Sequence, residues 1–403
     1  MKRDNYRIFS EGRIGSLMLP NRLVRSATWD PSILKIRQMT DEVLNLYKEI
    51  AFGGVGLIIT GGFPVFQEQA SNDDSNRWIS KYSAQRVKGI EQMPRIVHSS
   101  RQECKIIAQL ENGNLSASPS VIDSPYSRKK LRPLTKEEII DIVDCFVEAI
   151  VDMKRAGFDG VQLHAAHGGL LSRFLSPFTN RRNDAYGGST LSRVRIIQEI
   201  LTKARESVGN FPILIKMNCT DYIEGGINID TFPKLAREIE YTGIDAIEVS
   251  GGMWECLIRS EEELGFRPVP APESHTHINN PEKQSYFLKH TEKLDLSIPI
   301  ILVGGNRDIE RLEEIINRRK VEFIALSRPL ICEPDLPNRW LEGRGKRTTK
   351  CISCNSCIFD MHIHPGRPEP GLVTCVFKND KSKYKLAQKW ITSWVSRNSK
   401  KST

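Results

Sequence analysis

Short runs of aliphatic and β-branched residues recur along the chain and alternate with longer amphipathic stretches. Runs of this kind are typical of strands that are buried on both faces. Eight such strands are predicted, near Leu23–Ala27, Gly56–Thr60, Lys105–Gln109, Gly160–His164, Ile213–Met217, Ala246–Ser250, Pro299–Val303 and Phe323–Leu326. The clearest amphipathic stretches predict helices at Thr135–Ala156, Thr190–Ser207, Thr231–Thr242 and Asp308–Arg318.

This alternation predicts an α/β fold, namely a (β/α)8 TIM barrel with enlarged loops. A doubly wound parallel sheet is the alternative, but no Gly-x-Gly-x-x-Gly motif follows the first predicted strand. Two long loops are predicted after the fourth and sixth strands, at Ser176–Ser189 and Met253–Pro281. Long loops at strand ends are where barrel enzymes place substrate contacts.

The pattern changes after Pro329, where prolines, cysteines and finally lysines replace the alternation. We therefore predict a barrel over residues 1–343, a Cys-rich extension over 344–377 and a basic tail over 378–403. The tail has an apolar stripe at helical spacing, formed by Ala387, Trp390, Ile391, Trp394 and Val395. Such a helix packs on the barrel, lies on an anionic membrane surface, or binds an acidic electron-transfer partner.

Composition and charge narrow the class of protein. The chain has 403 residues, 39% of them hydrophobic, which is enough for a large core. We find no apolar run long enough for a membrane span and no signal peptide, so a soluble cytoplasmic protein is expected. Of the net charge of +9, eight basic residues and one acid in 378–403 supply +7, leaving +2 for the rest. A nucleic-acid groove across the body is therefore not expected.

Nine cysteines divide into two groups. Cys351, Cys354, Cys357 and Cys375 are clustered, with the spacing C-x2-C-x2-C-x17-C. The remaining five, Cys104, Cys145, Cys219, Cys256 and Cys332, are scattered through segments that resemble buried core. Clustered cysteines in a reducing compartment suggest a metal site, whereas scattered ones are usually small core residues.

The sequence His164-Ala165-Ala166-His167-Gly168-Gly169 begins at the end of the fourth predicted strand. In a parallel barrel the carboxyl ends of the strands carry the chemistry. The two imidazoles can donate hydrogen bonds to an oxygen of a bound ligand. A metal site is the weaker alternative because no third ligand lies nearby in the sequence, and a structural pair of histidines is another.

Two further strand ends carry residues suited to binding. Gly304-Gly305 after the seventh strand and Ser327-Arg328 after the eighth form a plausible anion cradle, which is where such barrels bind phosphate. A tight turn beside a surface arginine is the alternative. Gln109 and Lys216 end the third and fifth strands, and a cation there would stabilise charge on a reduced flavin. Lys216 would alternatively be a Schiff-base nucleophile or a surface lysine.

Several of these segments together resemble the old yellow enzyme family, the FMN-dependent ene-reductases and NADH:flavin oxidoreductases. The similarity runs from about Asn5 to Gly343. It is carried by Pro20-Asn21-Arg22-Leu23-Val24-Arg25-Ser26-Ala27-Thr28, Gly56-Leu57-Ile58-Ile59, Ala108-Gln109-Leu110 and the block from His164 to Gly188, which includes Ser176-Pro177, Asn180-Arg181, Asp184 and Tyr186-Gly187-Gly188.

The resemblance implies FMN across the C-terminal mouth of the barrel. The implied cofactor-binding residues are Ala27 and Thr28 beside the ring, Gly62 through its backbone, Gln109 and Lys216 at the polar edge, and Gly304, Gly305, Ser327 and Arg328 at the phosphate. His164 and His167 would be the catalytic pair that binds the substrate oxygen. Hydride would pass from reduced FMN to an activated C=C bond, with NAD(P)H or a protein donor as the reductant.

One position departs from the family pattern. Most members have a proton-donating tyrosine two residues after the second histidine position, and this chain has Gly169 there. Glycine cannot act as a general acid. Tyr222, His275 or His277 would replace it, or solvent would donate the proton. The alternative function is a flavin redox relay or sensor without ene-reductase activity. Trp29, next to Thr28, would help shape the cavity.

The cysteine cluster resembles that of the 2,4-dienoyl-CoA reductases and trimethylamine dehydrogenase, which hold a 4Fe-4S cluster. The resemblance implies Cys351, Cys354, Cys357 and Cys375 as ligands, although their last gap is longer than in those relatives. Zinc is the alternative, favoured slightly by His362 and His364 in the gap. We expect the chain to lack the FAD- and pyridine-nucleotide-binding domains that follow the cluster in those relatives.

Overall fold

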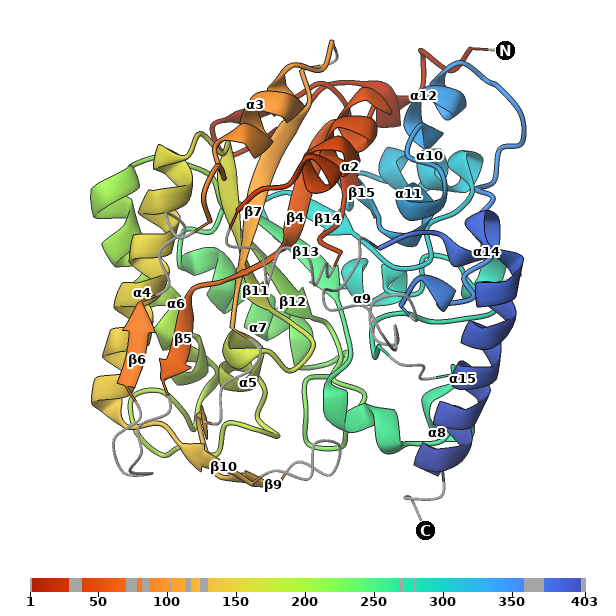
Figure 1. Cartoon of the computed structure of the whole chain (residues 1–403). Helices are drawn as coiled ribbons and strands as arrows, with labels where there is room; N and C mark the ends of the chain where they lie inside the picture. The colour runs from red at the N-terminus through yellow and green to blue at the C-terminus, as the bar shows by residue number, and fades with distance from the viewer. Residues whose placement is uncertain are drawn as a thin grey trace.

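A computed structural model describes residues 2–28, 38–69, 78–81, 87–101, 103–112, 117–123, 130–267, 271–278, 280–358 and 373–399. Eight parallel strands form a closed barrel, so the predicted (β/α)8 TIM barrel is confirmed (Figure 1). In chain order these strands are β3 (Leu23–Arg25), β4 (Leu57–Pro64), β7 (Lys105–Glu111), β11 (Gly160–Ala165), β12 (Ile213–Asn218), β13 (Ala246–Ser250), β14 (Ile300–Leu302) and β15 (Phe323–Leu326). The closure of the barrel excludes the doubly wound sheet.

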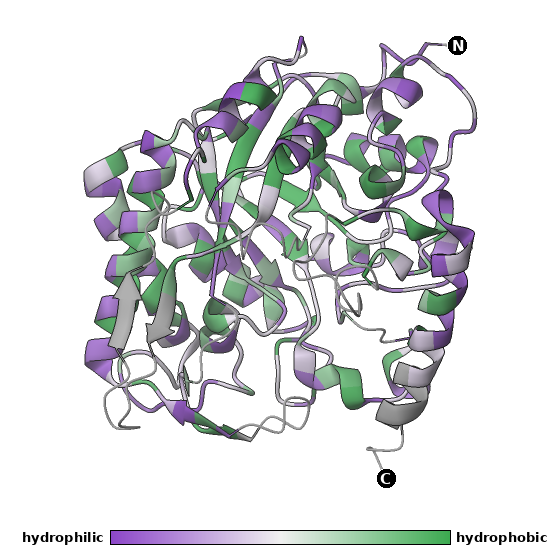
Figure 2. Ribbon diagram, in the orientation of Figure 1, coloured by the Kyte–Doolittle hydropathy of each residue, from purple (hydrophilic) through white to green (hydrophobic). Residues whose placement is uncertain are grey.

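Helices surround the barrel. Those of the outer layer are α2 (Asp41–Phe52), α3 (Gln92–His98), α4 (Lys136–Arg155), α6 (Thr190–Val208), α7 (Phe232–Tyr241), α9 (Leu288–Thr291), α10 (Ile309–Asn317), α11 (Arg328–Cys332) and α12 (Leu336–Leu341). Figure 2 shows hydrophobic residues along the strands and mixed helices around them. Helix α4 begins at a capping box, in which Thr135 and Glu138 satisfy each other's backbone amides.

The barrel interior is apolar in the half where the strands begin. Val24, Leu57 and Ile107 lie there together, and all three are fully buried. A hairpin of β1 (Gly12–Ile14) and β2 (Leu17–Leu19) contributes Ile14 and Leu19 to the same cluster, and so closes the end where the strands begin. The opposite end, where the strands finish, is left for polar side chains.

Loops at the C-terminal end of the barrel form further elements. These are the pair β5 (Phe66–Gln69) and β6 (Trp78–Lys81), the strands β8 (Ala117–Ser118), β9 (Ile122–Asp123) and β10 (Lys130–Pro133), the helices α5 (Leu170–Leu175) and α8 (Glu261–Leu264), and the 3-10 turns η3 (Trp254–Ile258) and η4 (Pro281–Lys283). A third 3-10 turn, η1 (Arg7–Phe9), precedes the hairpin.

The residues after the barrel lie against its last loops. Nη1 of Arg307 donates a hydrogen bond to Oγ of Ser353 at 2.5 Å, and Nδ2 of Asn355 donates one to the carbonyl of Ser274 at 2.7 Å. The chain then forms α14 (Val376–Asn379) and α15 (Lys381–Ser399). The Cys-rich segment therefore packs against loops at the C-terminal end of the barrel.

Helix α15 is anchored through part of its apolar stripe. Ala387 is 0% and Ile391 is 2% exposed, and Nε2 of Gln388 donates a hydrogen bond to Oγ of Ser356 at 2.8 Å. The side chains of Trp394 and Val395 lie outside the described residues. This part of the stripe packs within the protein, as one of the three sequence alternatives expected. Within the ranges given above, no helix is both long and apolar enough to cross a membrane.

Candidate active site

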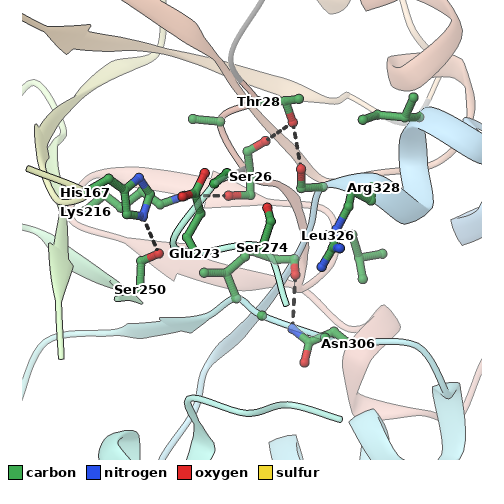
Figure 3. Close-up of a pocket in the computed structure, with 18 of the residues that line it drawn as sticks. Ser26, Thr28, His167, Lys216, Ser250, Glu273, Ser274, Asn306, Leu326 and Arg328 are labelled. Atoms are coloured by element: carbon green, nitrogen blue, oxygen red, sulfur yellow. Dashed lines mark hydrogen bonds between the residues drawn. The ribbon is translucent and has the colours of Figure 1, made fainter. Parts of the chain in front are cut away.

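A cavity of about 410 Å³ lies at the C-terminal end of the barrel (Figure 3). That volume is within the range of small-molecule and cofactor sites. All eleven residues that the sequence predicts for cofactor and substrate line it: Ala27, Thr28, Gly62, Gln109, His164, His167, Lys216, Gly304, Gly305, Ser327 and Arg328. The structure thus brings them together from seven different strands and the loops that follow them.

The two histidines occupy the end of β11 and the turn after it. Nε2 of His167 lies 2.7 Å from Oγ of Ser250, and the ring centroids of His164 and His167 are 5.2 Å apart. Nδ1 of His164 is buried and has no hydrogen-bond partner among the residues that the structure describes. Burial lowers the pKa of both imidazoles well below the usual value, and the nearby Lys216 ammonium lowers them further. Both rings are therefore neutral at physiological pH and keep one N–H to donate.

A connected polar network forms the floor of the cavity. Nε2 of Gln109 donates to Gln162 at 2.8 Å, and Nε2 of Gln162 donates to Glu248 at 2.8 Å. The other carboxylate oxygen of Glu248 accepts from Ser26 at 2.5 Å and from the Lys216 ammonium at 3.2 Å. Nζ of Lys216 also donates to Ser26 at 2.9 Å.

The network places Lys216 inside the barrel rather than on the surface. Its side chain is 5% exposed and that of Glu248 is 0% exposed. The alternative of a surface lysine is therefore wrong. The Glu248 carboxylate is therefore the buried counter-charge of the Lys216 ammonium at the cavity floor.

Three members of this floor were not predicted as site residues from the sequence: Ser26, Gln162 and Glu248. A signal was present, because Gln162 and Glu248 interrupt runs that were interpreted as buried strands. A polar side chain in a strand covered on both faces needs a buried partner. Two such side chains in different strands of one barrel point to a shared interior network.

Glycines form the wall beyond β14. Gly304 has φ +104° and Gly305 has φ +72°, and a Cβ on Gly304 would lie 2.6 Å from the Tyr286 ring. Only glycine adopts this backbone conformation readily, and here its lack of a side chain also leaves the backbone open to the cavity. Oγ of Ser327 lies 3.0 Å from Oγ1 of Thr28.

Two guanidinium groups line this same wall. Nη1 of Arg328 donates to the carbonyl of His275 at 2.8 Å and to Oδ1 of Asn355 at 2.5 Å. Arg307, which the sequence analysis did not predict, also lines the cavity. Two cations beside exposed glycine backbone suit a dianionic group such as a phosphate ester.

The predicted replacements for the missing tyrosine do not line the cavity. The His275 ring is stacked between Phe266 and Tyr286, at centroid distances of 3.6 and 3.8 Å. Tyr222 lies behind it, with its hydroxyl 3.5 Å from Nε2 of His275, and His277 is exposed. None of the three is among the residues that form the cavity wall, so these donors do not reach its interior. Trp29, His362 and His364 lie outside the described residues.

The four clustered cysteines line a second, smaller pocket next to the cavity. Cys357 and Arg328 belong to both linings. All nine cysteines carry free thiols. A hydrogen bond from Cys332 lowers the pKa of Cys375 to about 6, while burial raises that of Cys357 to about 12. Within the described part of the chain, no three His, Cys, Asp or Glu side chains are placed to hold a metal ion.

Comparison with known proteins agrees with this geometry. Residues 7–347 match the sequence model of the NADH:flavin oxidoreductase / NADH oxidase family. The chain is 33% identical over 367 residues to an NADH oxidase from Thermoanaerobacter brockii, an alignment that covers 87% of this chain and 53% of that enzyme. It is 30% identical over 341 residues to an NADPH dehydrogenase from Clostridium acetobutylicum, covering 81% and 92% respectively.

The chain therefore spans about half the length of the Thermoanaerobacter relative. Among solved structures, it superposes on an old yellow enzyme homologue from Zymomonas mobilis with a TM-score of 0.64. The sequence identity is 21%, and the alignment covers 85% of this chain and 94% of that one. At this identity the likeness shows the fold.

Proposed function

The chain belongs to the NADH:flavin oxidoreductase / NADH oxidase family, and from that premise we propose that it binds FMN and reduces an activated carbon–carbon double bond. The observation that carries the proposal is the convergence of the eleven predicted residues on one cavity. The cavity fits the cofactor, because a cation at its floor and two guanidiniums on its wall match the two ends of FMN. When bound, FMN supplies the hydride.

The chain's own residues would hold the cofactor at both ends. Lys216, kept charged by Glu248, would stabilise the negative charge of the reduced pyrimidine ring, with Gln109 beside it. Arg328 and the open backbone of Gly304 and Gly305 would bind the phosphate. The Lys216 Schiff-base alternative is disfavoured, because an ammonium paired with a buried carboxylate is a poor nucleophile.

His164 and His167 would bind and polarise the substrate oxygen. Their pKa values are lowered by burial, so they would act as neutral donors rather than as acids. Nδ1 of His164 is buried and finds no partner within the described ranges, which is costly unless a ligand satisfies it. Donors held at that point would stabilise the charge that develops on the oxygen during hydride addition.

Cofactor retention tests the proposal most directly. The purified protein, reconstituted with FMN and desalted, is expected to keep flavin absorbance and to reduce 2-cyclohexenone with NADH or NADPH. Arg328→Ala provides the comparison, because loss of a phosphate contact should weaken retention without unfolding the barrel. A wild type that loses all flavin on desalting would refute the function.

The clustered cysteines support a further proposal, a 4Fe-4S cluster held by Cys351, Cys354, Cys357 and Cys375, as in the 2,4-dienoyl-CoA reductase and trimethylamine dehydrogenase branch. Four thiols on one pocket are the donor set that such a cluster needs. In the described residues these thiols are not grouped closely enough to hold a metal ion. Iron, sulfide and zinc analysis decides between the cluster and zinc.

The free thiols are also consistent with a cytoplasmic location.

The second candidate function is a flavin relay that passes electrons without reducing a double bond. Gly169 favours it, because that position supplies no proton. A Cβ built on Gly169 lies 3.4 Å from its nearest neighbours, an ordinary contact, so a side chain can be tested there. A large gain in enone turnover in Gly169→Tyr would support the relay. Unchanged fast turnover would mean that another group already donates the proton.

A further inference from the structure

Reduction of a double bond needs a proton donor as well as a hydride donor. The carbon next to the one that receives hydride gains an electron pair and must be protonated. Gly169 cannot do this, and Tyr222, His275 and His277 do not line the cavity. The neutral histidines bind the oxygen. The donor must therefore be sought among the remaining titratable groups of the cavity wall, which include Glu111 and Glu273.

Glu111 stands beside the histidine pair. Strands β7 and β11 are parallel neighbours, with Gln109 opposite Gln162 and Leu110 opposite Leu163. The two glutamines point into the barrel and the two leucines pack outside it. Glu111 follows Leu110, and His164 follows Leu163. Because side chains alternate along a strand, Glu111 and His164 both face the interior, from adjacent strands.

The Glu111 side chain also lies directly over Gly62. A Cβ built on Gly62 would be 2.5 Å from Cγ and 3.2 Å from Oε1 of Glu111. Among the residues that the structure describes, the carboxyl has no hydrogen bond or ion pair. Burial raises its pKa to about 7. A carboxyl of this kind is a proton donor at neutral pH, and no structural partner accounts for its presence.

We propose that Glu111 is the general acid that protonates the substrate carbon, an inference that rests on the proposed function. Hydride adds with its electron pair to one carbon of the double bond, and the π pair moves to the other carbon. That carbon takes the proton from the Glu111 carboxyl, whose O–H pair stays on the carboxylate. Water then reprotonates Glu111, which is half-buried. The substrate gains two electrons, and NAD(P)H is oxidised.

Glu273 is the competing acid, because it also lines the cavity. Figure 3 shows it close to Lys216 and His167, with Ser274 on its other side. Burial raises its pKa, and the charges of Lys216 and Arg328 oppose that rise. The two cations favour the charged form of Glu273, whereas burial alone sets the raised pKa of Glu111, so Glu111 is the better proton donor.

The decisive comparison uses two acceptors. NADH reduction of 2-cyclohexenone needs a proton on carbon, and reduction of ferricyanide needs only electrons. Glu111→Gln should lower enone turnover by about 10²- to 10⁴-fold and leave ferricyanide turnover unchanged. Glu111→Asp should recover part of the loss.

Wild-type enone turnover should fall as the pH rises through about 7, and Glu111→Gln should lose that dependence. Exposed Glu49→Gln is the matched control.

A spectroscopic readout separates the acid from a structural residue. Infrared spectra of the oxidised protein should show a protonated carboxyl near neutral pH that is absent in Glu111→Gln and present in Glu49→Gln. Unchanged enone turnover in Glu111→Gln would overturn the proposal, as would selective loss in Glu273→Gln. A wild type that reduces ferricyanide but no enone would instead refute the proposed function, and the role of Glu111 with it.

Discussion

Glu248 is the residue on which the cavity floor depends. Its carboxylate accepts hydrogen bonds from Gln162, Ser26 and Lys216, and its side chain is 0% exposed. Gln162 and Lys216 lie on two different strands of the barrel, and Ser26 directly follows a third. A buried ion pair contributes little net stability when complete, but removing one charge leaves the other desolvated and unpaired.

We therefore predict that Glu248→Gln destabilises the FMN-free protein. The amide can keep hydrogen bonds to Gln162 and Ser26, but the Lys216 ammonium loses its counter-charge. The expected loss in free energy of unfolding is about 3–5 kcal/mol, measured by urea denaturation. Glu49→Gln, which removes the same charge from an exposed site, should change it little. Equal stabilities for the two variants would mean that the ammonium is solvated in the apoprotein.

Individual site residues could be predicted from the sequence where they lie at strand ends and belong to known motifs. His164, Lys216 and Gly304 were found in this way, and they line the cavity. Glu248 was missed because a strand interpreted as apolar hides the polar side chain that faces inward, and Glu111 was missed because its strand was predicted to end at Gln109. Whether such a side chain meets a partner or an open cavity depends on neighbouring strands, and those pairings are not encoded locally.

At the scale of elements, hydrophobic periodicity located all eight barrel strands. Their lengths were less accurate: β4 continues to Pro64, past an irregular register between Ile59 and Gly62, whereas β14 has only three residues. The small sheets above the barrel were not predicted. Strands such as β8 and β9 have two residues each, too few for an alternating pattern, and their pairing depends on distant loops.

Helix α15 allows a test of how the tail is held. Ala387 is fully buried, while its neighbour Leu386 is 57% exposed. We predict that Ala387→Glu, which buries a charge, releases α15 and makes it sensitive to limited proteolysis, whereas Leu386→Glu does not. The urea midpoint of the barrel should be unchanged in both. Equal proteolysis of the two variants would show that α15 is not anchored through Ala387.

The whole molecule places three features at one end: the cavity, the thiol pocket and α15. The thiol pocket shares Arg328 and Cys357 with the cavity, and its rim includes the exposed Ile352 and Phe377. Because residues 378–399 hold six basic residues and one acid, the described part of this end is strongly basic. A positively charged surface with exposed apolar side chains is the kind of surface that binds an acidic electron-transfer protein.

This arrangement predicts a salt dependence that is specific to the electron donor. Reduction by an acidic ferredoxin should slow steeply as ionic strength rises past 0.1 M, where the Debye length is about 10 Å. Reduction by NADH should change little, because that molecule meets the cavity directly. Reversing the exposed Lys381, Lys385 and Lys389 to Glu should slow only the ferredoxin reaction, by about 10- to 10³-fold. Stopped-flow measurements of the reduction rate with each donor would test this prediction. If both rates depended equally on ionic strength, α15 would not be part of the binding site for the protein donor.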